Sequence, residues 1–243
     1  NLFLNNRDHR KIMSIDGKVA YTGGFNMADE YFHIVEPYGE WKDTAVRIEG
    51  DAAKGHTLIF LENWNAMRIR RREGIETEIE KYLPATDYVQ KEKCFIHPYA
   101  DRPTDNEQVG ENVYLEIISQ ATDYIYISTP YMIISDEMVS ALTLAAKRGV
   151  DVRMITPGIP DKKIIYMLTR SYYHMLARDG VKIFEYTPGF NHAKMCVSDD
   201  KVATCGTINF DYRSFYNNFE DGCAFFYCQA VLDEKADLLE MLS

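Results

Sequence analysis

The sequence lacks several features that would indicate its class directly. It contains no run of about 18 apolar residues, the length that a membrane-spanning helix requires. Its five cysteines are odd in number and form no CxxC pair, so they predict neither a disulfide framework nor a cysteine-rich metal site. This use of cysteine favours a reduced, intracellular setting.

Positive charge is also scarce. The 243 residues include 27 Lys and Arg against 37 Asp and Glu, which gives a net charge of −10. A protein that grips nucleic acid needs a basic stripe to displace phosphate counterions. We therefore expect no nucleic-acid partner. The sequence has no HExxH motif and no carboxylate cluster at ligand spacing, so we expect no metal and no other cofactor.

What the sequence does contain is one motif that occurs twice. The pattern is His-x-Lys, four residues, Asp, six residues, Gly-x-x-Asn, and its second copy begins 183 positions after the first. Identical spacing of five residue types indicates a duplicated structural unit. The two copies consist of His9, Lys11, Asp16, Gly23 and Asn26, and of His192, Lys194, Asp199, Gly206 and Asn209.

The motif predicts a hairpin that carries polar groups at one end. On a strand, His-x-Lys places both side chains on one face. A turn at the Asp then returns the chain, so that Gly-x-x-Asn lies beside the His and the Lys. Each copy would supply an imidazole, an ammonium and an amide to an anion. Asp16 and Asp199 are candidate catalytic residues as members of the motif, although a turn is their more common role. The candidate substrate-binding residues here are Gly24, Asn26, Thr207 and Asn209.

The remainder of the sequence predicts an α/β fold. Apolar segments of strand length alternate with helical ones after residue 111, which favours a parallel or mixed sheet with helices on its faces. A polar segment over residues 82–111 holds three of the eight prolines and separates two halves. We place the C-terminal part of the first half at residues 1–92 and the second half at residues 93–243.

The double motif resembles that of the phospholipase D superfamily, and its flanks resemble bacterial cardiolipin synthase. The flanking segments are GGFNMADEY, WKDTAVRIEG, STPYMI, AAKRGVDVRMITP and GTINFDYRSFYNNFE. The resemblance implies a phospholipase D-like fold, in which two similar mixed-sheet halves flanked by helices hold the active site between them. It also implies that the first half is truncated at its front and that this chain is a fragment of a longer protein. We expect that protein to reside in the cell membrane through segments absent here, with its catalytic part facing the cytoplasm.

Two histidines suit phosphodiester exchange. Near neutral pH one imidazole can attack phosphorus while the other protonates the leaving alcohol, and the two motif lysines hold charge on the phosphoryl oxygens. Each imidazole also needs a carboxylate on its far nitrogen. The resemblance implies that Glu220 serves His192 and that Asp43 serves His9. It assigns His9 as the nucleophile and His192 as the acid, and the near-symmetry of the motifs leaves the reverse open.

Three functions compete at this point. The resemblance implies phosphatidyl transfer between two phosphatidylglycerol molecules, giving cardiolipin and glycerol through a phosphohistidine. The second is hydrolysis of a phosphodiester, as by a phospholipase D or a nuclease, and the third is a non-catalytic lipid- or phosphate-binding remnant. Tyr131, in STPYMI, would border the substrate pocket. Because the front of the first half is missing, we also expect its sheet to be short of strands and to leave an exposed edge.

Overall fold

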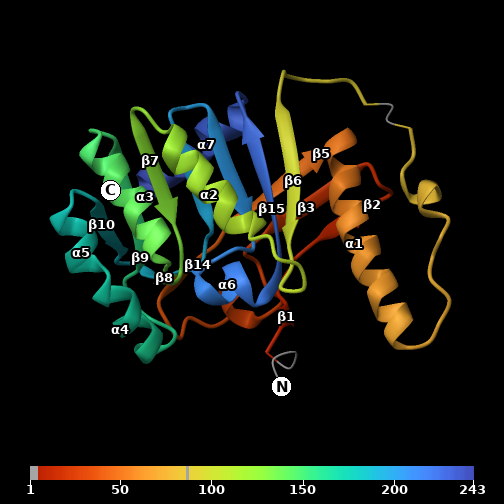
Figure 1. The fold of residues 1–243 in the computed structure, drawn as a ribbon, viewed down its shortest axis with the longest axis horizontal. Helices are drawn as coiled ribbons and strands as arrows, with labels where there is room; N and C mark the ends of the chain where they lie inside the picture. The colour runs from red at the N-terminus through yellow and green to blue at the C-terminus, as the bar shows by residue number, and fades with distance from the viewer. Residues whose placement is uncertain (1–4, 86–87) are drawn as a thin grey trace.

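The computed structural model describes residues 5–85 and 88–243. Its main feature is an eight-stranded mixed sheet formed largely by the second half, with helices on both faces (Figure 1). Strands β7, β9 and β10 run parallel, and β12, β13, β15 and β6 continue the sheet in antiparallel pairs. The order is β1 (Arg7–Asp8), β15 (Asn218–Phe226), β13 (Val202–Gly206), β12 (Met195–Ser198), β7 (Tyr124–Ser128), β9 (Asp151–Pro157) and β10 (Lys182–Tyr186), and β6 (Phe95–Asp101) also pairs with β15.

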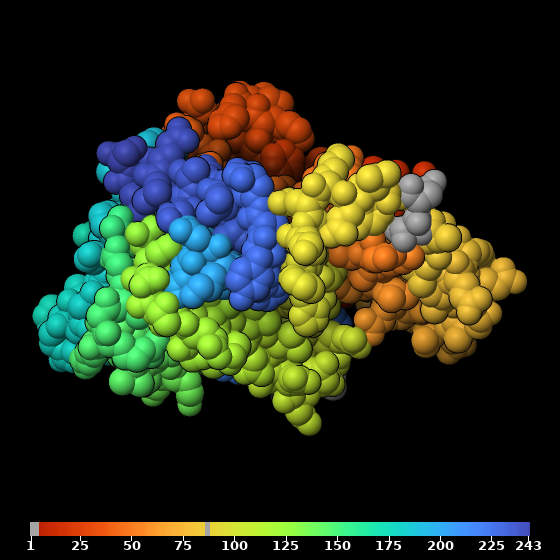
Figure 2. All heavy atoms as spheres, turned by 90° about the horizontal axis from the view of Figure 1, so that it is seen from above, coloured from red at the N-terminus to blue at the C-terminus, as the bar shows by residue number. Residues whose placement is uncertain are grey.

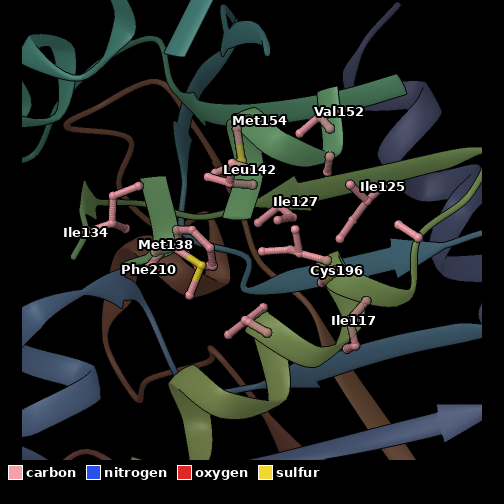
Figure 3. Close-up of a cluster of buried hydrophobic side chains, with 14 of the residues drawn as sticks. Ile117, Ile125, Ile127, Ile134, Met138, Leu142, Val152, Met154, Cys196 and Phe210 are labelled. Carbon is pink, nitrogen blue, oxygen red and sulfur yellow. The ribbon is translucent and has the colours of Figure 1, made fainter. Parts of the chain in front are cut away.

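Strand β7 shows how the sheet separates two hydrophobic cores. Its isoleucines, Ile125 and Ile127, lie in one core, and its tyrosines, Tyr124 and Tyr126, lie in the other, because successive side chains of a strand point to opposite faces. Figure 3 shows the first of these cores, in which side chains from α2 and α3 meet those of the strands. Its helices are α2 (Val109–Gln120), α3 (Asp136–Lys147), α5 (Tyr173–Arg178) and α6 (Tyr212–Tyr216), while α7 (Gln229–Met241) covers the other face.

The first half contributes a smaller sheet. It has three strands in the order β2 (Met13–Ile15), β3 (Val19–Gly23) and β5 (Ala45–Glu49), and α1 (Asp51–Arg70) packs against it. Helix α1 and the segment that follows it project from one end of the molecule (Figures 1 and 2). The edge strand β2 exposes 56% of Met13 and 45% of Ile15. This three-stranded sheet with exposed apolar side chains on β2 agrees with the expectation that the first sheet is short of strands and leaves an exposed edge.

Two short parallel pairs join the halves across the expected boundary between residues 92 and 93. Strand β1 pairs with β15, and β11 (Gly189–Asn191) pairs with β4 (Glu40–Lys42). The remaining elements are short. They are the pair β8 (Met132–Ile133) and β14 (Phe210–Asp211), helix α4 (Lys163–Ser171), and the short helices η2 (Asp29–Phe32) and η3 (Ile79–Tyr82).

Candidate active site

The parallel pairs between the halves place the two motif histidines. The pairing of β1 with β15 continues past Asp8, and the backbone amide of His9 donates to the carbonyl of Phe219 at 2.9 Å. In the same way β11 leads into His192, whose amide donates to the carbonyl of Lys42 at 2.7 Å. In each case the residue beside the histidine in this register is an acid from the other half.

These acids bond the histidines directly. Nδ1 of His9 lies 2.8 Å from Oε2 of Glu220, and Nδ1 of His192 lies 2.8 Å from Oδ2 of Asp43. The expected pairing of Glu220 with His192 and of Asp43 with His9 is therefore wrong. It followed proximity within each repeat, whereas the parallel strand pairs exchange the acids between repeats. With Nδ1 held by a carboxylate, Nε2 of each ring is left for chemistry.

Thr207 and Gly24 were expected to bind substrate, but each instead lies against one of these carboxylates. The hydroxyl of Thr207 donates to Oε2 of Glu220 at 2.5 Å, and the side-chain amide of Asn218 donates to Oε1 at 3.0 Å. At the corresponding position of the first half, a Cβ on Gly24 would lie 2.1 Å from Oδ1 of Asp43, so only glycine leaves room for that carboxylate. The structure thus places both residues behind the acids.

The motif lysines are held by the backbone of their own motifs. Nζ of Lys11 donates to the carbonyl of His9 at 2.5 Å, and Nζ of Lys194 donates to the carbonyl of His192. Lys194 is only 1% exposed, and this burial lowers its pKa to about 7, against the opposing charge of Asp43.

Burial also lowers the pKa of Lys11, and the largest opposing effect comes from Glu220. The two ammonium groups are close enough for Lys11 to lower the pKa of Lys194. The motifs therefore meet in one electrostatic cluster, and a phosphodiester anion between the two lysines would stabilise the charged form of both.

His192 lies in an aromatic pocket. The ring centroids of Tyr31, Trp41 and Phe190 are 5.3, 5.5 and 6.0 Å from that of His192, and the hydroxyl of Tyr31 is 3.4 Å from its Nε2. Burial, followed by the charge of Lys194, lowers the pKa of His192 to about 4, and the bond to Asp43 acts in the opposite direction. The His9 side chain is more accessible, at 26% exposed against 8% for His192.

Sequence reasoning missed this pocket. Tyr31, Trp41 and Phe190 belong to no motif, and residues of these types usually belong to an ordinary core. The available signal was the flanks that carry the family resemblance, since Tyr31 ends GGFNMADEY and Trp41 begins WKDTAVRIEG.

The motif asparagines differ in their contacts. The amide of Asn26 donates to the hydroxyl of Tyr31 at 2.7 Å. Asn209 is buried, and among the described residues its Oδ1 has no hydrogen-bond partner. A buried, unpaired amide oxygen is uncommon in folded proteins, and a donor on a bound substrate would satisfy it. The hydroxyl of Tyr131 donates to Oδ2 of Asp161 at 2.6 Å, and its ring lies 6.3 Å from that of Phe190 at the border of the aromatic pocket.

The motif aspartates lie in turns rather than at the site. Asp199 follows β12 at the end opposite Lys194, and its carboxylate accepts hydrogen bonds from the backbone amides of residues 122–124 at 2.8 to 3.0 Å. Both Asp16 and Asp199 adopt left-handed backbone conformations, with φ of 53° and 54°. The expectation that they are catalytic is therefore corrected to a turn role, and Asp199 anchors its hairpin to the start of β7.

Within the described ranges, no group of three or more His, Cys, Asp or Glu side chains is arranged to hold a metal ion. In the same part of the chain, no helix is both long enough and apolar enough to cross a membrane.

The chain is similar to several known proteins. Residues 114–231 match a family model described as the PLD-like domain of cardiolipin synthase. The chain is 37% identical to a cardiolipin synthase of Geobacillus thermodenitrificans, over 98% of the chain and 46% of that protein. It is 38% identical to a cardiolipin synthase 2 of Bacillus anthracis, again over 98% of the chain and 46% of the relative. An uncharacterized protein of Streptococcus mutans is 48% identical over 99% of the chain and 51% of its own length. The chain thus spans about half the length of the curated relatives it matches.

Solved structures share the fold at low sequence identity. A phosphatidylserine synthase of Haemophilus influenzae superposes with a TM-score of 0.69 and 15% identity, covering the whole chain and 63% of that structure. The phospholipase D family member Nuc from Salmonella typhimurium gives a TM-score of 0.52 and 17% identity, over 62% of this chain and 95% of its own. At such identities the likeness concerns the fold alone.

Proposed function

Because the chain belongs to the phospholipase D superfamily, we propose that it carries the catalytic site of a phosphatidyl transferase that joins two phosphatidylglycerol molecules into cardiolipin and glycerol. The observation that carries the proposal is the meeting of two histidine–carboxylate pairs, exchanged between the halves, beside the buried Lys194 and the half-buried Lys11. The names of the curated relatives support the choice of substrate and product. Since this chain spans about half the length of those relatives, we propose the activity for a longer protein of their length that contains this chain.

The reaction proceeds in two displacements at one phosphorus atom. In the first, Nε2 of one histidine attacks the phosphodiester of a phosphatidylglycerol, and the other histidine gives a proton to the departing glycerol oxygen. The product is a phosphatidyl group bonded to histidine. In the second, the now neutral acid takes a proton from the hydroxyl of another phosphatidylglycerol, whose oxygen attacks phosphorus and frees the histidine. Lys11 and Lys194 stabilise the charge on the non-bridging oxygens in both steps.

We assign the attack to His9 and the proton transfer to His192, as the resemblance implies. The greater exposure of the His9 side chain supports its role as the residue whose Nε2 reaches phosphorus. The lowered pKa of His192 opposes its role as an acid in the free protein, so the substrate anion must raise it.

A substrate with a leaving group that needs no proton tests the assignment. With the nitrophenyl ester of a phosphatidic acid, His192→Ala should still release a burst of nitrophenol equal to the amount of enzyme, and His9→Ala should release none. The opposite pattern would exchange the two roles.

Mass spectrometry of the products tests the function itself. Incubation of the longer protein with vesicles of labelled phosphatidylglycerol should yield cardiolipin and glycerol in equal amounts, and the double variant His9→Ala/His192→Ala should yield neither. Phosphatidic acid without cardiolipin would instead identify a hydrolase, which is the alternative function. The lack of any product from the wild-type protein would leave only a lipid- or phosphate-binding role.

The remaining assignments follow from the same proposal. The partner is phosphatidylglycerol in a membrane, with no nucleic acid and no cofactor. We place the longer protein at the cell membrane, attached through segments outside this chain and with the catalytic part facing the cytoplasm. Fractionation of cells that express the longer protein, with protease added from either side of the membrane, would test this orientation.

A further inference from the structure

Asp221 lies next to Glu220 on β15 but contacts a different set of groups. It is fully buried, and its carboxylate faces three elements of the first half. Oδ1 accepts a hydrogen bond from the backbone amide of Lys11 at 3.3 Å, and Oδ2 accepts one from the hydroxyl of Thr22, on β3, at 2.5 Å. The third element is α1, from which Nε2 of His56 approaches Oδ2 to 3.7 Å. One side chain of the second half thus ties together the motif segment, the sheet and the helix of the first half.

His56 does not neutralise this carboxylate. It is completely buried, and within the described residues neither of its ring nitrogens has a hydrogen-bond partner. Burial lowers the pKa of His56 to about 4, so that the ring is neutral at physiological pH. Burial raises the pKa of Asp221 to about 7, and the hydroxyl of Thr22 opposes that rise. Above neutral pH, Asp221 therefore holds a buried negative charge beside the motif.

We propose that Asp221 is a positioning residue for Lys11, which fixes the backbone of the first motif through the Lys11 amide and keeps the Lys11 ammonium charged through its own carboxylate. This inference rests on the proposed function, because it gives Lys11 the task of holding a phosphoryl oxygen. Glu220 and Asp43 already hold the two histidines. Asp221 instead bonds the lysine segment itself.

The carboxylates that act on Lys11 come from three strands and the residues next to them. Glu220 and Asp221 lie on β15, Asp43 follows β4, and Asp8, on β1, is paired with Arg10 at 2.9 Å. The cations facing it are those of the second motif, Lys194 and His192 when protonated. Asp221 also interacts with Glu220 and Arg10. Of the carboxylates that support the charge of Lys11, only Glu220 has a larger effect than Asp221.

The second motif supplies a comparison within the same molecule. Since Glu220 corresponds to Asp43, Asp221 corresponds to Thr44, whose hydroxyl lies 3.5 Å from Oδ2 of Asp237. An uncharged residue thus occupies the position equivalent to Asp221 beside the second motif, whose lysine, Lys194, has its pKa lowered by burial to about 7. The two motif lysines thus differ at this position, where the strand beside Lys11 carries a carboxylate and its counterpart carries a threonine.

The substitution Asp221→Asn separates the charge from the hydrogen bonds. An asparagine oxygen can still accept from the Lys11 amide, and its NH₂ can donate to Thr22 or to the neutral His56. Titration of the lysine Cε resonances by NMR, with Lys11 identified from its loss in Lys11→Arg, should show a lower pKa for Lys11 in Asp221→Asn. A decrease of about one unit would reduce the charged fraction of Lys11 about tenfold on the alkaline side. Asp101→Asn is the matched control, since Asp101 is also a buried carboxylate next to Glu220 in the sheet and should leave Lys11 unchanged.

A kinetic readout uses bis(p-nitrophenyl) phosphate with the same proteins. In Asp221→Asn the alkaline limb of kcat/KM should move to lower pH, whereas a purely structural role would lower the melting temperature and leave the limb in place. Thr22→Val is a second variant, in which Asp221 loses a hydrogen-bond donor and stays protonated to higher pH. The pKa of Lys11 should then fall as in Asp221→Asn, but by less. An unchanged Lys11 titration in both variants overturns the proposal. The titration needs no turnover, so a protein that makes no cardiolipin but shows the Lys11 shift would refute only the proposed function.

Discussion

The exchange of acids between the halves can be tested at His192. In the structure Asp43 is the carboxylate on its Nδ1, and this bond opposes burial and the charge of Lys194, which nevertheless lower the pKa of the ring to about 4. A hydrogen bond to a charged group contributes about 1.5–3 kcal/mol, which corresponds to about 1–2 pKa units. Asp43→Asn should therefore lower the pKa of His192 further by about that amount.

The assay is an NMR titration of the histidine ring nitrogens, followed by kinetics. The protonated form of His192 is the one that donates to the leaving group. At pH values above its pKa, a decrease of 1–2 pKa units should therefore slow the first displacement about 10- to 100-fold. Glu220→Gln is the cross-control, because its carboxylate bonds His9 and its removal should leave Nδ1 of His192 engaged. If instead Glu220→Gln moves the titration of His192 and Asp43→Asn does not, pairing within each repeat is correct and our reasoning from strand register fails.

Three further predictions concern the same site. Because burial sets the pKa of Lys194 at about 7, its ammonium is lost as the pH rises through that value, and calorimetry should show weaker binding of dimethyl phosphate, a monoanion throughout, at pH 8 than at pH 6. Thr207→Val removes a hydroxyl that donates to Glu220 and should lower kcat about tenfold through a lost hydrogen bond to a charged group, with KM little changed, while Thr143→Val on α3 should have no such effect. Tyr131→Ala opens the border of the aromatic pocket and should raise the ratio of phosphatidic acid to cardiolipin while slowing the first displacement less, and an unchanged product ratio would locate acceptor selection elsewhere.

The sequence predicted the residues of the site better than their partners. Spacing alone identified His9, Lys11, His192 and Lys194, because the chemistry requires those residue types on one face of a strand. It could not pair the acids, since which strand lies beside β1 or β11 depends on packing between segments about 150 to 210 residues apart. The hydrogen bond from Thr207 to Glu220 could not be predicted either, because no sequence pattern relates a threonine inside the motif to a carboxylate on another strand.

The fold shows the same division. Some features follow from local sequence alone: Ser135, a residue type favoured at helix N-termini, accepts from the amide of Met138 at 3.2 Å, and β7 alternates between two cores. The helical segment between residues 163 and 178 is divided into two helices, α4 and α5, that meet at Tyr172. The apolar periodicity of the sequence does not indicate this break. At the break, the hydroxyl of Tyr172 donates to the carbonyl of Ile134 at 3.2 Å, a contact between segments distant in the sequence.

The repeat also explains the exposed apolar side chains of the first half. At the offset of 183 residues, Met27 corresponds to Phe210 and Phe32 to Phe215. The second-half residues are 1% and 2% exposed, because Tyr114 of α2 packs on them with ring centroids 5.0 and 6.2 Å away. Their counterparts are 87% and 53% exposed, and the described part of the first half has no helix in the place of α2.

The edge of β2 differs from its counterpart in the same way. Strand β12 pairs with β7 along its whole length, whereas β2 pairs only with β3 among the described strands. Unpaired strand edges beside apolar surface favour association with another chain. We therefore expect this 243-residue chain, expressed alone, to form oligomers that grow with concentration in light scattering. Met13→Lys/Ile15→Lys, which places charge on that edge, should reduce them, and Leu144→Lys on α3, equally exposed but away from the edge, should not. A wild-type chain that remains a monomer and unfolds cooperatively would show that the three-stranded sheet is stable with its edge open.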